Sequence, residues 1–253
     1  MKNFDHPLLL SFFLFAALWL SMLIGSLLSR LKKLDRDDRQ DFNIILTATL
    51  TLLSLILGFS FSMAISRYDQ RKGYEEAEAN AISTEYVRAE LLPPADATRV
   101  QTLLRRYLQQ RISFYEMEDS RRIPRINDET SRLQTDLWES VKGSAATGST
   151  ATARLVLSGM NDVINSQERA QGSWWNRIPT PAWILMAIIA ICSSLLLGFG
   201  GHHLRSRPLI FLVLPFVITT ALYLIAEIDS PRNGLIHVTP ENLVNISRSL
   251  QTR

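Results

Sequence analysis

The feature that most constrains the fold is an uncharged apolar segment, residues 44–65, which runs directly into a charged stretch rich in helix formers. Its roughly 22 residues are long enough to cross the hydrocarbon core of a bilayer as an α-helix. Gly73 is the only glycine in the stretch that follows, and no proline occurs before Pro93. These residues predict one long helix that leaves the membrane near Ser66 and ends at the paired prolines, Pro93 and Pro94.

Three other uncharged apolar runs have the length of a membrane span or nearly so: residues 8–28, 182–200 and 209–226. Such segments are expected to be helical, because only a helix satisfies its own backbone hydrogen bonds within lipid. The sequence therefore predicts an all-α integral membrane protein with four transmembrane helices. We expect a first helix pair in residues 1–65, a helical extramembrane domain in 66–180, a second pair in 181–228 and a tail in 229–253.

The predicted extramembrane domain contains amphipathic helical patterns rather than strand patterns. Apolar residues recur at helical spacing over residues 96–117 and 150–171. A basic loop around Pro124 is expected to precede another helix, capped by Asn127 or Asp128. Residues 240–250 predict a terminal helix. Trp174 and Trp175 are expected where the chain re-enters the membrane, since tryptophan favours that interface.

Charge and cysteine content exclude several classes of function. The net charge is +3, but basic and acidic residues are interleaved, so no nucleic-acid partner is expected. The single cysteine, Cys192, lies in the third span and excludes an intramolecular disulfide. We find no nucleophile–base pair, phosphate-binding loop or metal-spaced ligands, so we expect no enzyme, cofactor or metal site. The spans lack Asp, Glu, Lys and Arg, which disfavours an ion-coupled transporter.

One face of the second span has a distinct composition that permits two interpretations. Small or hydroxyl-bearing residues recur at helical spacing, with two bulky apolar residues beside them: Thr47, Thr51, Ser54, Gly58 and Ser62, then Leu55 and Phe59. In a pore, hydroxyls can donate hydrogen bonds to a dehydrating anion, while apolar side chains gate by excluding water. Alternatively, small residues allow helices to pack closely in lipid.

Charged residues at the ends of two spans are further candidates. Arg67, Arg71 and Lys72 follow the second span, where they can concentrate anions at a pore mouth. The favoured alternative is that they anchor the helix at lipid headgroups or pair with nearby acids. The other group, Glu227, Asp229 and Arg232, forms a polar turn after the fourth span, for which we favour a structural role over metal binding.

Several short motifs resemble known membrane proteins. The sequence LGFSFSMAISRYDQ, residues 57–70, resembles the second membrane helix of bestrophin anion channels. Residues 78–82, 86–93 and 229–234 are similar to a prokaryotic bestrophin-like family whose members are mostly uncharacterised. The resemblance extends over most of the chain, from about residue 46 to 243.

The resemblance implies a pentamer enclosing one axial anion pore, with both termini and the extramembrane domain in the cytosol. It also implies a pore neck at Thr51, Leu55 and Phe59, although Thr51 departs from the bulky apolar pattern. The expected location is the cell inner (plasma) membrane, and the expected partners are the lipid bilayer, further copies of the chain and inorganic anions such as chloride. Charge alone does not orient the protein, because the Lys and Arg totals near the spans nearly cancel. The competing hypothesis is a non-conducting membrane scaffold or sensor whose helical domain binds a partner or ligand.

Overall fold

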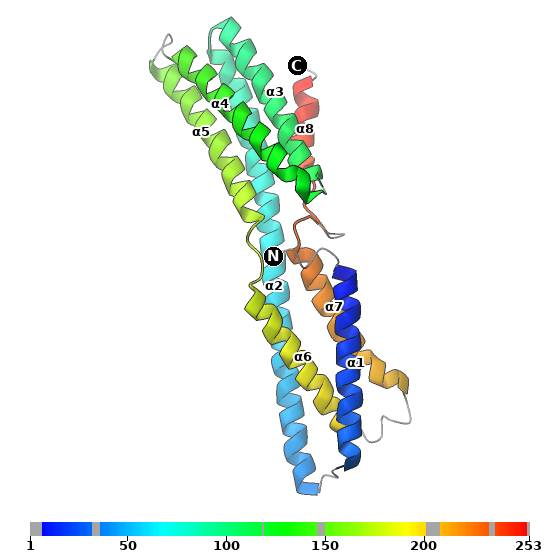
Figure 1. Ribbon diagram of the computed structural model, residues 1–253. Coiled ribbons are helices and arrows are strands. Elements are labelled where there is room, and N and C mark those ends of the chain that lie inside the picture. The colour runs from blue at the N-terminus through cyan, green and yellow to red at the C-terminus, as the bar shows by residue number, and fades with distance from the viewer. Residues whose placement is uncertain are drawn as a thin grey trace. The chain divides into compact units, whose positions relative to one another are not determined.

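The computed structural model describes residues 7–31, 36–117, 119–145, 150–200, 208–232 and 236–251. Those residues form helices and contain no β-strand, which confirms the predicted all-α class (Figure 1). The α-helices are α1 (Pro7–Leu31), α2 (Arg36–Arg88), α3 (Pro94–Glu116), α4 (Ile123–Ala145), α5 (Thr150–Ser173), α6 (Thr180–Gly200), α7 (Pro208–Asp229) and α8 (Glu241–Gln251). Two 3₁₀ turns, η1 (Ala89–Leu91) and η2 (Ser120–Arg122), precede α3 and α4.

Among the described residues, four helices are long and apolar enough to span a membrane, which confirms the prediction of four spans. They are α1, α2, α6 and α7. Helix α2 is continuous over 53 residues, so its apolar part and the charged stretch beyond it belong to one helix. It gives way to η1 just before Pro93 and Pro94, because a proline inside a helix cannot donate a backbone hydrogen bond.

The chain divides into two compact units, and the first contains the membrane-spanning helices. This membrane unit comprises the described residues of Met1–Ser66 and Arg177–Ile236. Helix α1 packs along α6 and also contacts α7. A Cβ atom on Gly25 would overlap the carbonyl oxygen of Leu195, and one on Gly198 would overlap that of Met22. Helices α1 and α6 therefore approach closely because glycines face each other's backbones, as is common in membranes.

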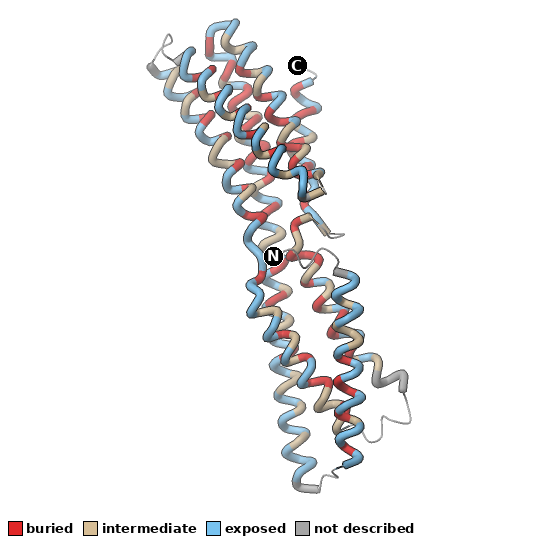
Figure 2. The backbone as a smooth tube through the Cα atoms, in the orientation of Figure 1, coloured by how far each residue is buried: buried red, intermediate tan, exposed pale blue. Residues whose placement is uncertain are grey.

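The second unit, here the helical unit, comprises the described residues of Arg67–Asn176 and His237–Arg253. It contains the second part of α2 together with α3, α4, α5 and α8, whose inward faces are buried (Figure 2). The aromatic rings of Phe114, Tyr115 and Trp174 pack edge to face, with centroids 5.1–5.6 Å apart. Such pairs add to the free energy gained from burying apolar area.

Two local predictions were wrong. Helix α4 begins at Ile123 rather than at a cap formed by Asn127 or Asp128, so the expected basic loop is helical. Pro124 permits this because it lies in the first helical turn, where its missing N–H would have no intrahelical partner. Trp174 is only 6% exposed and belongs to the core of the helical unit, whereas Trp175 is 79% exposed.

Candidate pore-facing surface and the buried charges of α2

The membrane-spanning part of α2 has one exposed side and one packed side. Leu53, Ser60 and Ala64 are buried within the membrane unit. On the other side, Leu55 is 55% exposed and Phe59 is 65% exposed. The remaining residues predicted to line a pore are also exposed within the single chain: Thr47, Thr51, Ser54 and Ser62. The structure therefore brings together all six residues of the predicted pore lining on the exposed side of one helix.

The exposed side of α2 is not used for helix packing within one chain. A Cβ atom on Gly58 would meet no atom within 4 Å, counting only the part of the chain that the structure describes. Close packing through glycine occurs instead between α1 and α6, at Gly25 and Gly198. This side of α2 is therefore available to lipid, water, ions, another copy of the chain or a different protein.

One hydroxyl group on this surface already has a hydrogen-bond acceptor in its own helix. The Ser54 hydroxyl donates to the Leu50 carbonyl oxygen at 2.9 Å, one turn earlier in the same helix. This local bond is common for serine in apolar helices and satisfies the donor when no other acceptor is present. The hydroxyl must rotate its hydrogen away from Leu50 before it can donate to an anion.

The three basic residues predicted at the end of the second span do not form one exposed group. Arg71 is only 2% exposed, and its Nη2 donates to the Asn176 carbonyl oxygen at 3.4 Å. Arg67 is half-buried, whereas Lys72 is exposed. Of the three, Lys72 alone offers a fully exposed charge.

Two exposed acids flank Lys72. Asp69 and Glu76 lie about one helical turn before and after it, and both are exposed. Glu76 is one of the nearby acids with which the basic residues were expected to pair. In an ideal helix, Asp69, Lys72 and Glu76 share the phase of Thr51, Ser54 and Gly58, about five turns earlier.

The polar turn after the fourth span contains a structural contact. Both carboxylate oxygens of Asp229 accept the backbone N–H of Ile178, at 3.0 and 3.2 Å. Asp229 is 5% exposed and Glu227 is 3% exposed, while Arg232 is half-buried. The Asp229 carboxylate thus joins the end of α7 to the backbone just before α6, as expected for a residue that fixes the turn.

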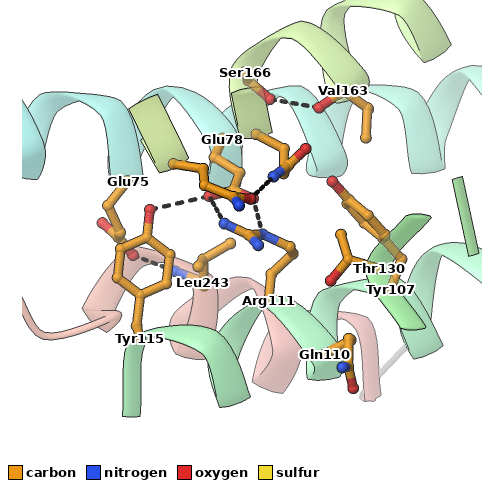
Figure 3. Close-up of polar contacts among 12 residues, drawn as sticks. Glu75, Glu78, Tyr107, Gln110, Arg111, Tyr115, Thr130, Val163, Ser166 and Leu243 are labelled. Atoms are coloured by element: carbon orange, nitrogen blue, oxygen red, sulfur yellow. Dashed lines mark hydrogen bonds and ion pairs between the residues drawn. The ribbon is translucent and has the colours of Figure 1, made fainter. Parts of the chain in front are cut away.

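The helical unit contains a buried charge cluster that the sequence interpretation did not identify. Glu78 of α2 accepts hydrogen bonds from Nε and Nη2 of Arg111 and, at 3.0 Å, from the Tyr115 hydroxyl (Figure 3). The side chains of Glu78 and Arg111 are both fully buried. Burial disfavours the charged guanidinium, but the adjacent Glu78 carboxylate outweighs this, and the pKa of Arg111 is raised. Burial, reinforced by Glu78, also raises the pKa of Tyr115.

A second buried carboxylate of α2 caps the C-terminal helix. Glu75 is 1% exposed and accepts the backbone N–H of Leu243 at 3.0 Å and the amide of Asn242 at 2.7 Å. This places a carboxylate at the N-terminus of α8, where it complements the helix dipole. Burial of Glu75 raises its pKa despite these hydrogen bonds. At the opposite end of α8, Arg105 Nη2 donates to the Leu250 carbonyl oxygen at 3.2 Å.

Comparison with known proteins identifies the family. The sequence matches the bestrophin-like domain over residues 12–243. The chain belongs to the bestrophin-like family. A search of curated proteins found no relative that matches it. Within the described residues of this bestrophin-like protein, no group of three or more His, Cys, Asp or Glu side chains is placed to hold a metal ion.

The fold of this bestrophin-like protein is similar to crystal structures of a bacterial bestrophin homologue from Klebsiella pneumoniae. One, of a tryptophan-to-alanine mutant, has a TM-score of 0.70 and 14% identity, and the match covers 98% of this chain and 97% of that chain. Another, of an aspartate-to-alanine mutant, has a TM-score of 0.69 and 15% identity, covering 95% and 97%. This likeness shows the fold. Together with the four spans, family membership establishes a multi-pass membrane protein of a channel-like family.

Proposed function

We propose that this protein is an oligomeric anion-permeable channel whose pathway is lined by the exposed side of α2. The observation that supports this most strongly is the combination of exposure and composition on that side. Four hydroxyl-bearing residues (Thr47, Thr51, Ser54 and Ser62) are exposed in a segment long enough to cross the membrane. These hydroxyl groups cannot form hydrogen bonds with lipid tails, whereas they can form them with water and with anions.

Leu55 and Phe59 form the neck of the proposed pathway. Both are more than half exposed and lie one turn apart, so equivalent side chains from several copies would narrow the pathway and exclude water. Thr51, one turn earlier, would allow water to hydrate one end of the neck. The predicted spans contain no Asp, Glu, Lys or Arg, which supports passive permeation rather than coupled transport.

The proposal requires several copies of the chain, because one helix face cannot enclose a pathway. A homo-oligomer, with the pentamer implied by the bestrophin resemblance, would place α2 from each copy around a common axis. Inorganic anions such as chloride would pass along that axis in the inner (plasma) membrane. We further propose that the helical unit lies in the cytosol.

The test is to record current from the purified full-length protein in planar bilayers under a chloride gradient. We expect a reversal potential near that of chloride, and altered conductance or selectivity in Leu55→Ala and Phe59→Ala. Matched controls are Leu185→Ala on α6 and Phe216→Ala on α7, whose side chains are similarly exposed at 49% and 63%. These controls remove the same atoms from other exposed surfaces and should leave the current unchanged.

Two results would reject the channel proposal. One is a monomer in mild detergent, since a monomer cannot form an axial pathway. The other is the absence of current over a wide voltage range from protein shown to be inserted, which would favour the scaffold or sensor. Unchanged currents in both neck variants would reject the assignment of Leu55 and Phe59 while leaving conduction intact.

A further inference from the structure

Glu85 differs from the other buried glutamates of α2 in its lack of hydrogen-bond donors. Its side chain is fully buried, and neither carboxylate oxygen has a hydrogen-bond partner among the residues that the structure describes. Glu75 and Glu78 are equally buried, but each accepts hydrogen bonds from at least two groups. A buried carboxylate without donors is far less stable in its charged form than one that is hydrogen-bonded.

The surroundings of Glu85 leave little room for a compensating charge. Gly159 of α5 packs directly against the carboxyl group, and a Cβ atom at that glycine would overlap Oε2. Nη1 of Arg88 lies 4.0 Å from Glu85 Oε2, beyond hydrogen-bond distance, and 3.9 Å from Asp162 Oδ2. Within the described part of the chain, the charged groups facing Glu85 are thus Arg88 on its own helix and Asp162 on α5, and Arg88 is shared between these two acids.

We propose that Glu85 is a proton-binding site at the contact between α2 and α5, protonated in the folded protein at neutral pH. A bound proton makes the carboxyl group neutral and removes the cost of burying its charge. Burial is the largest influence on Glu85, Arg88 opposes it and Asp162 reinforces it, so that the pKa of Glu85 rises to about 8. Release of the proton in mildly alkaline solution leaves a buried anion against Gly159.

A groove beside this contact brings water close to it. The groove has a volume of about 520 Å³ and runs between α2 and α5, with Ala77 and Ala81 on one wall and Asp162, Ser166 and Arg169 on the other. Ala81 lies about one helical turn before Glu85. The Asp162 side chain is 61% exposed and also faces Arg88. The Arg88–Asp162 ion pair beside Glu85 is therefore in contact with solvent on its Asp162 side.

Deprotonation has a structural consequence that is independent of ion conduction. The new negative charge must be stabilised by Arg88 moving closer or by water entering between α2 and α5. When the contact opens, Glu85 meets water and releases its proton at a lower pH than in the closed contact. The opening free energy of the α2–α5 contact is therefore expected to fall as the pH rises from about 4.5 to about 8.

The direct test is infrared spectroscopy of the full-length protein in detergent, titrated across pH 8. The wild type should show the C=O stretching band of a buried protonated carboxylic acid at neutral pH, lost with a midpoint near 8. Glu85→Gln should lack that band, whereas Glu76→Gln, at an exposed acid of the same helix, should retain it. Absence of the band in the wild type, or its persistence in Glu85→Gln, would overturn the proposal.

Hydrogen exchange gives a second measurement that does not depend on assigning a band. Wild type and Glu85→Gln are compared at the same pH, so that intrinsic exchange chemistry cancels. Near pH 4.5 the two should exchange alike in α5, because this side chain is then neutral in the closed and the open state of both proteins. Between about pH 4.5 and 8 the wild type should exchange increasingly faster in α5 than the variant, because opening then releases the proton of Glu85. Equal rates at every pH would mean that the charge of Glu85 does not govern the α2–α5 contact.

Discussion

Removing the Arg111 guanidinium is expected to destabilise the helical unit by about 3–5 kcal/mol, the usual cost of leaving one partner of a buried ion pair alone. Arg111→Met is the suitable change, because methionine can fill the space of the arginine stem beside Phe114 and Tyr115. Arg111 also lies over the Phe114 ring, with its guanidinium carbon 4.4 Å from the ring centroid. The variant loses this cation–π contact as well, and Glu78 retains the hydrogen bond from Tyr115.

A second variant isolates the contribution of the pair itself. The double variant Glu78→Gln/Arg111→Met removes both charges. It should therefore lose at least about 2 kcal/mol less than the sum of the single variants.

Hydrogen exchange of the full-length protein in detergent is the appropriate assay. The chain forms two compact units, so a single melting temperature would not isolate the stability of one of them. Protection of the α3 and α4 amides reports the opening free energy of the helical unit directly. A loss below about 1 kcal/mol in Arg111→Met, or strictly additive losses in the double variant, would show that the Glu78–Arg111 pair does not stabilise this unit.

Three further predictions concern other contacts. Gly25→Ala should lower the free energy of unfolding of the membrane unit by about 2 kcal/mol, because its Cβ would overlap the α6 backbone. Gly58→Ala has open space around it and should leave that free energy unchanged. Equal losses in the two variants would contradict the packing argument. Glu75→Ala should speed hydrogen exchange in α8, at a cost of about 1–2 kcal/mol, because it removes the helix cap; unchanged exchange would contradict this. The folded-state pKa of Glu85 is raised above its ordinary value of 4.5, so the opening free energy of the α2–α5 contact should fall as pH rises from about 4.5 to about 8 and then level off. Glu85→Gln should abolish that slope, and a slope that persists would assign it to another group.

The membrane spans were predictable because their signal is long and local. Roughly 20 consecutive uncharged apolar residues span the hydrocarbon core of a bilayer as a helix, and this does not depend on contacts with the rest of the chain. The two interpretations of the hydroxyl-bearing face could not be separated in the same way, since sequence does not show which side of a helix meets its neighbours. The positions of α1 and α6 show that the close glycine contacts within one chain occur between those two helices.

The buried charges were missed because charged residues on a helix are usually exposed. Glu75, Glu78 and Glu85 nevertheless recur at helical spacing, in phase with the buried apolar residues Ala79, Ile82, Tyr86 and Ala89. Arg111 follows the same rule on α3, at helical spacing from Leu104, Leu108 and Tyr115. Helical phase could therefore have identified which charges are buried. Their partners depend on contacts between helices distant in sequence, which periodicity does not specify.

Each of the three buried glutamates of α2 faces a different helix. Glu75 binds the N-terminus of α8, Glu78 binds Arg111 of α3, and Glu85 packs against Gly159 of α5. Apolar contacts alone would let these helices slide along α2, whereas directional bonds to a fixed carboxylate hold one register. The first two contacts are supported by hydrogen bonds that favour the charged carboxylate. The third has no such bond, so α5 is held most firmly when Glu85 is neutral.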